Sequence, residues 1–173
     1  MGLELKCKLC HTTTDEEDIF CRGCGVRLLT SPKYDLSKAD YAYKGDLEKL
    51  ALLKELATPA ALIKAFYLRK AISLHEKEIS FRSRLVDRNS WLGFLLVKCA
   101  DKLCLKYLPK MYVDYELGFN AYSFGLDEKP YIVVGEALLK AFTELEVAAL
   151  LGHELGHIRC GHMLYHTLAE FIL

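Results

Sequence analysis

Two histidines in the segment HELGH, residues 153–157, have the spacing of a metal-binding helix. Residues four apart project from one face of an α-helix, so the imidazoles of His153 and His157 can bind the same ion. Glu154 lies about 100° around the helix from His153, where its carboxylate can take a proton from a zinc-activated water instead of binding the metal. The segment therefore predicts a hydrolytic zinc site with two histidine ligands and Glu154 as general base.

Four cysteines near the N-terminus form two CxxC pairs, Cys7 with Cys10 and Cys21 with Cys24. Each pair forms a tight turn, and two such pairs supply a tetrahedral set of four thiolates for a structural zinc. A segment of about 30 residues cannot build an adequate core alone, so the metal would supply its folding free energy. We therefore expect a zinc ribbon at residues 1–29. A redox role for either pair is the alternative, and the absence of a surrounding βαβ pattern disfavours it.

The charge balance gives no electrostatic reason to expect a nucleic-acid partner. Basic and acidic residues number 23 each, so no net field draws the chain onto phosphates. The four consecutive acidic residues between the cysteine pairs, at 15–18, also oppose phosphate binding. We therefore expect the ribbon to be structural or to bind another protein.

The cysteine count and the N-terminus indicate a reducing, cytoplasmic compartment. The chain has seven cysteines, an odd number that argues against a disulfide framework, and the N-terminus lacks the apolar core of a secretory signal. No run of 18 or more uncharged apolar residues occurs, so no segment of this sequence is expected to span a membrane by itself.

Apolar residues at helical spacing predict three helices in the first two thirds of the chain. Their expected bounds are residues 46–57, 59–78 and about 90–108, after a linker at residues 30–45. Thr58 and Pro59 mark the start of the second helix, because threonine caps helices and proline is tolerated at the first helical position. Asn89 or Ser90 caps the third helix, and Pro109 ends it.

Short aromatic and β-branched segments follow these helices and predict a small sheet. The expected strands are residues 111–116, 121–124 and 131–134, followed by a short helix at 136–142. Thr143 and Glu146 then form a T-x-x-E capping box that opens the helix carrying HELGH. The fold class predicted is α+β: a mainly helical domain with a small sheet before the HELGH helix, plus the N-terminal ribbon.

Residues 120–168 resemble the catalytic core of the HtpX/CAAX-prenyl-endopeptidase family of gluzincin metalloproteases. The matching features are the Asn-Ala-aromatic element at 120–122, the strand at 131–134 and the helix ELEVAALLGHELGH. The resemblance implies a zinc metalloendopeptidase domain over residues 46–173, with His153 and His157 as ligands of a catalytic zinc. It implies that Glu154 is the general base, and that one strand of the sheet binds the backbone of a polypeptide substrate by β-augmentation.

The resemblance also implies a third zinc ligand, a glutamate on a later helix. Only 16 residues follow His157, and Glu170 is the sole carboxylate among them. If the helix continued, Glu170 would lie about 20 Å further along its axis and could not reach the metal. The third ligand is therefore unknown in this chain, which we expect to be C-terminally truncated, to hold the catalytic zinc weakly and to be inactive alone. Membrane association is expected only through segments outside it.

Two further residues near HELGH are not expected to bind the metal. His162 follows His157 by five positions, whereas the metzincin pattern needs a third histidine six positions on. We expect His162 to lie beside the ligands or at the surface, and Cys160 to be a buried thiol. The alternative function is a non-catalytic pseudo-protease or a zinc-ribbon adaptor for protein partners, and the missing third ligand favours it.

Overall fold

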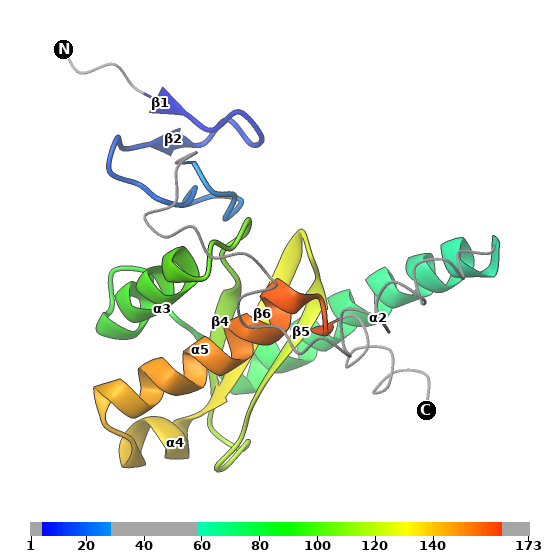
Figure 1. Ribbon diagram of the computed structural model, residues 1–173. Helices are drawn as coiled ribbons and strands as arrows, with labels where there is room; N and C mark the ends of the chain where they lie inside the picture. Colours follow the sequence, from blue (N-terminus) through cyan, green and yellow to red (C-terminus); the bar gives the residue numbers. More distant parts are fainter. Residues whose placement is uncertain (1–4, 29–58, 164–173) are drawn as a thin grey trace.

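The computed structural model describes residues 5–28 and 59–163, and in helix α2 it describes the side chains from residue 68 onward (Figure 1). A four-stranded sheet of order β3-β4-β6-β5 forms the centre of the main domain. Its strands are β3 (Ser83–Leu85), β4 (Lys110–Asp114), β5 (Ala121–Leu126) and β6 (Lys129–Gly135). The β4–β6 pair is parallel, and the β3–β4 and β5–β6 pairs are antiparallel. Three of these strands confirm the predicted β segments.

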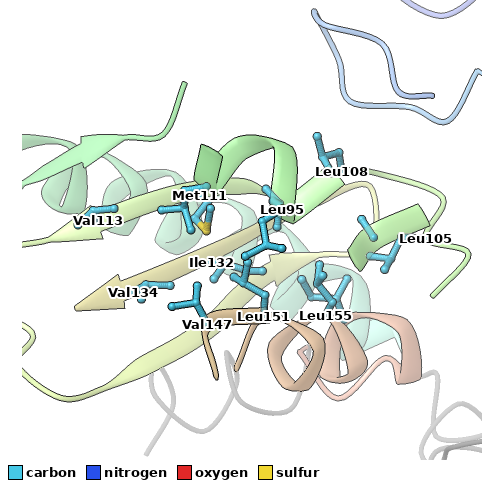
Figure 2. Close-up of a cluster of buried hydrophobic side chains, with 14 of the residues drawn as sticks. Leu95, Leu105, Leu108, Met111, Val113, Ile132, Val134, Val147, Leu151 and Leu155 are labelled. Carbon is cyan, nitrogen blue, oxygen red and sulfur yellow. The ribbon is translucent and has the colours of Figure 1, made fainter. Parts of the chain in front are cut away.

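Helices cover both faces of this sheet. The helices are α2 (Pro59–Arg82), α3 (Trp91–Lys102), α4 (Glu136–Ala141) and α5 (Glu144–Cys160). Alternate residues of a strand face opposite sides, so Ile132 and Val134 pack toward α3 and α5 while Tyr131 and Val133 pack toward α2. Figure 2 shows the first set meeting the leucines of α5. The mixed helix and strand composition with small sheets confirms the predicted fold class at this level.

The helix that carries HELGH begins where the sequence predicts. The Thr143 hydroxyl accepts a hydrogen bond from the Glu146 amide, and the Glu146 carboxylate accepts one from the Thr143 amide at 2.8 Å. This reciprocal capping box satisfies two amides that the first turn leaves without helical partners. One face of α5 then buries Val147, Leu151 and Leu155 completely against the sheet. That anchorage fixes which face of the helix carries the histidines.

The predicted end of α3 at Leu108 is wrong, since the helix ends at Lys102. Cys104 adopts a left-handed conformation with φ of 54°. Its amide donates to the carbonyl of Asp101, and the Leu105 amide donates to the carbonyl of Ala100. This is the Schellman pattern that closes a helix, and it occurs five residues before Pro109. Strand β3 lies between the second and third predicted helices, where the sequence predicted no element.

The cysteine-rich segment packs directly against the end of α3. Its two-stranded sheet pairs β1 (Leu5–Lys6) with β2 (Thr13–Thr14). Phe20 is only 2% exposed and belongs to the same core cluster as α3 and α5. The Arg27 guanidinium pairs with the Asp101 carboxylate at 2.6 Å and donates to the Leu105 carbonyl at 2.8 Å. The segment is therefore joined to the main domain by both apolar and charged contacts.

A half-buried carboxylate joins α2 to the opposite face of the sheet. Glu76 accepts hydrogen bonds from the Tyr131 hydroxyl at 2.5 Å, from Lys110 at 2.8 Å and from Lys129 at 3.1 Å. Burial alone would raise the pKa of Glu76, but these three donors outweigh it and hold the pKa at about 2. The ionised carboxylate is thus more stable in the folded chain than in the unfolded one.

Replacing Glu76 by glutamine is expected to lower the free energy of unfolding at neutral pH by about 1–3 kcal/mol. Because the folded pKa of about 2 lies below the ordinary value of 4.5, this contribution is complete above pH 4.5 and disappears as the pH falls through 2. Urea unfolding of both proteins across that range measures the difference. A gap between wild type and variant that stays constant down to pH 2 would contradict the assignment.

Several predicted features lie outside the described residues. They are the linker at 30–45, the helix at 46–57, the Thr58 cap, Glu170 and the rest of the segment after Met163. Among the helices that are described, none is both long and apolar enough to cross a membrane.

Candidate active site

Helix α5 brings the two predicted histidine ligands together. The Nε2 atoms of His153 and His157 lie 3.1 Å apart, with the ring planes at 83°. Two nitrogens bound to one tetrahedral zinc at about 2.0–2.1 Å would be about 3.3 Å apart. The imidazoles therefore need only a slight opening to share an ion, and the residues present fit a bound metal.

Glu154 is a buried carboxylate with no partner in the part of the chain that the structure describes. It is 6% exposed, and among the described residues nothing forms a hydrogen bond or an ion pair with its side chain. Burying an unpaired charge costs several kcal/mol, so such groups in proteins usually lie beside a cation or take up a proton. A metal held by the neighbouring histidines is the cation that this position fits.

His162 lies beside His157, one of the two predicted ligands, as the sequence predicts. Its Nδ1 atom is 3.3 Å from Nδ1 of His157, on the side of that ring away from His153. His162 is therefore not placed to bind an ion that lies between the two Nε2 atoms. Cys160 is 5% exposed, which agrees with the predicted buried thiol.

Within the described part of the chain, no third carboxylate, imidazole or thiol joins the histidine pair to complete a metal site. The reasoning that excluded Glu170 assumed a continuous helix, and that assumption is wrong. Helix α5 ends at Cys160, and Gly161 closes it in a left-handed conformation with φ of 79°. Glu170 itself lies outside the described residues.

Strand β5 runs beside α5 as an edge of the sheet, since β6 is its one partner among the described strands. The Gly135 amide donates to the Asn120 carbonyl, so these two residues are a hydrogen-bonded pair of the antiparallel ladder. Hydrogen-bonded and non-hydrogen-bonded pairs then alternate along β5 and β6. By that alternation the main-chain groups of Ala121 and Ser123 point away from β6. The edge is therefore suited to pairing with an extended chain. The sequence predicted such a strand but did not identify which one.

The four ribbon cysteines converge on one point. Their sulfur atoms all lie within 4.8 Å of one another, with Cys7 to Cys24 at 3.7 Å and Cys10 to Cys21 at 3.5 Å. Four sulfurs around a tetrahedral zinc at about 2.3 Å would be about 3.8 Å apart. The predicted cluster is therefore present, with dimensions that fit zinc.

Hydrogen bonds around this cluster favour thiolates at two positions. The backbone amides of Cys10 and Leu9 lower the pKa of Cys7. Hydrogen bonds with the hydroxyl and main chain of Thr12 lower the pKa of Cys10 to about 6. Burial raises the pKa of Cys24 to about 12, so a metal would have to displace that proton on binding.

Sequence reasoning missed the residues that attach the ribbon to the main domain. Arg27 and Phe20 make these contacts, together with Arg88, whose guanidinium donates to the Phe20 carbonyl at 3.1 Å. Their partners lie more than sixty residues away in the chain. No local pattern could have identified them.

A family profile described as "Peptidase family M48" matches residues 87–173. This range begins just before α3 and contains the whole sheet except β3, together with α4 and α5. It therefore includes both histidines, Glu154 and the edge strand β5.

Three relatives carry protease names. "Plastoglobule-localized metallopeptidase 48, chloroplastic" of Arabidopsis thaliana is 32% identical over 141 residues, covering 80% of this chain and 41% of that protein. "Protease HtpX homolog" of Bordetella petrii is 34% identical over 50% of this chain and 29% of its own length. "Probable CAAX prenyl protease 1" of Schizosaccharomyces pombe is 42% identical over 30% of this chain and 11% of its own length. The chain spans less than half the length of each of these relatives.

Proposed function

The chain belongs to peptidase family M48, and we propose that it carries the catalytic helix of a zinc-dependent metalloendopeptidase. The observation that carries the proposal is the grouping on α5 of two imidazoles at 3.1 Å with a buried carboxylate that has no partner among the described residues. His153 and His157 would hold the catalytic zinc through Nε2. Cys7, Cys10, Cys21 and Cys24 would hold a second, structural zinc.

A catalytic zinc supplies Lewis-acid chemistry, which polarises the scissile carbonyl and makes water a better nucleophile. Glu154 is the general base, and its carboxylate accepts the proton of the attacking water. The same carboxylate can then donate that proton to the leaving amine.

The substrate is proposed to be an extended polypeptide aligned along β5. The Ala121 carbonyl and both main-chain groups of Ser123 can pair with a substrate backbone as an added antiparallel or parallel strand. The Ala121 amide already donates to Oδ1 of Asn120 at 2.9 Å, so it would have to exchange that acceptor for the substrate. Because β5 lies beside α5, a strand added there would run past the histidine pair. Recognition through main-chain groups makes little demand on substrate sequence, so side-chain pockets would have to supply selectivity.

The proposal predicts two zinc equivalents per chain with different affinities. The cysteine site supplies four ligands and should retain zinc, whereas the described residues supply two histidines to the catalytic site, which should bind more weakly. Zinc titration of wild type and of a His153→Ala, His157→Ala double variant tests this. The double variant should lose one equivalent and keep the other.

Casein cleavage is measured in the same samples before and after treatment with 1,10-phenanthroline. Any cleavage should disappear on chelation, return with added zinc and be absent from the double variant. Cleavage that survives either treatment contradicts a metal-dependent mechanism. A wild-type chain that binds one zinc equivalent instead of two contradicts the catalytic site.

The alternative is a non-catalytic chain that acts as a pseudo-protease or as an adaptor for protein partners. It is favoured by the lack of a third ligand among the described residues. The zinc titration separates the two functions, because an adaptor needs the cysteine site alone.

A further inference from the structure

We propose that His162 is a positioning residue: it accepts a hydrogen bond from Nδ1 of His157 and so leaves Nε2 of His157 unprotonated for the metal. This inference rests on the proposed metal site and extends it to a residue outside the HELGH segment. It starts from the 3.3 Å contact between the Nδ1 atoms of the two rings.

The end of α5 places His162 at this position through the backbone. Gly161 is left-handed, with φ of 79°, and turns the chain back over the last turn of the helix. The His162 amide then donates to the carbonyl of His157 at 3.0 Å, and the Gly161 amide donates to the carbonyl of Ile158 at 3.2 Å. Main chain and side chain of His162 therefore both contact the same histidine.

The two contacts of the His157 ring differ in chemistry. Its Nε2 atom faces Nε2 of His153, where an ion would bind, and its Nδ1 atom faces His162. A neutral imidazole carries one proton, so a ring that offers Nε2 to a metal must carry the proton on Nδ1. That proton needs an acceptor, and Nδ1 of His162 is in place to accept it.

A partner on the second ring nitrogen generally fixes the orientation and protonation of a metal-binding histidine, and removing it weakens metal affinity by about 10–100-fold. The arrangement here supplies this partner five residues after the ligand. The protein consequently needs no separate loop to orient His157, because the helix end does so.

The first test reads the tautomer in the absence of metal at the histidine site. Long-range proton–nitrogen correlation spectra of the histidine-labelled chain, at about pH 8 where histidines are neutral, distinguish the two tautomers. We expect His157 to be protonated on Nδ1 and His162 on Nε2. A wild-type His157 protonated on Nε2 would overturn the proposal.

The second test compares substitutions at position 162. His162→Leu keeps a side chain of similar size but removes the hydrogen-bond acceptor. It should weaken metal binding at the histidine site by about 10–100-fold. His162→Asn places an amide oxygen close to the original Nδ1 position and should recover most of that loss. The same change at an exposed histidine of the ribbon, His11→Asn, is the matched control and should leave this affinity unchanged.

The measurements are competition with a chelator of known affinity and the visible spectrum of the cobalt(II)-substituted site. A leucine variant that binds within about twofold of wild type, with an unchanged cobalt spectrum, would overturn the proposal. If the leucine variant fails to fold, the asparagine variant and the wild-type tautomer still decide it. A wild type that binds no second metal contradicts the proposed function, whereas the tautomer measurement still judges the role of His162.

Discussion

In a protein that contains this chain and cleaves peptides, replacing Glu154 by glutamine is expected to lower the rate of cleavage by about 10²–10⁴-fold. Glutamine has nearly the same shape, but its amide cannot take a proton from water at neutral pH. Because Glu154 is assigned to proton transfer and not to metal binding, zinc stoichiometry should stay at two per chain. The turnover number should fall while the Michaelis constant changes little.

The same variant has a second expected effect that needs no activity. It keeps both imidazoles in place, so its affinity for zinc at the histidine site should change little. Competition with a chelator of known affinity measures this. Glu144→Gln, at an exposed position in the first turn of the same helix, is the control and should leave the turnover number unchanged. An unchanged turnover number in the Glu154 variant would refute its role.

Replacing Cys21 by serine is expected to abolish tight zinc binding at the ribbon and to unfold residues 5–28. Zinc contributes about 10–16 kcal/mol to the folding of comparable small zinc modules, which a segment of this size cannot replace with apolar contacts. The stability of the main domain should also fall, by about 3 kcal/mol, because Phe20 leaves its core.

Zinc content, limited proteolysis of the ribbon and thermal unfolding of the remainder measure these effects. Cys104→Ser is the matched control, because Cys104 lies outside the four-sulfur cluster. It should leave the zinc content unchanged. A Cys21 variant that keeps both zinc equivalents and resists proteolysis as wild type does would show that the cluster does not bind metal.

The parts of this molecule that sequence predicts well are those fixed by neighbours in the chain. The cap at Thr143, the HELGH spacing and the paired cysteines each lie within a few residues of their partners, and the structure has each arrangement in place. Short runs of aromatic and β-branched residues were likewise sufficient to locate three of the four strands of the main sheet.

The errors have two causes, a distant contact at β3 and a local conformation at Cys104. Strand β3 has only three residues. They form a strand because they pair with β4, which lies about thirty positions later in the chain. An ion pair at 2.9 Å joins Arg82, the last residue of α2, to the fully buried Asp114, the last residue of β4. The end of α3 was misplaced for a local reason that propensity does not reveal, since Cys104 adopts a conformation that cysteine rarely takes.

The contacts between the ribbon and α3 also set an order of events during synthesis. Arg27 precedes its partners Asp101 and Leu105 by 74 and 78 residues. At ordinary translation rates roughly 4–16 s pass before those partners are made. A zinc-loaded ribbon can fold in that interval, but Phe20 lacks the contacts with the main-domain core cluster until α3 leaves the ribosome. The nascent chain is therefore open to aggregation or to chaperone binding at this stage. If zinc is available, the ribbon is already folded when α3 is synthesised.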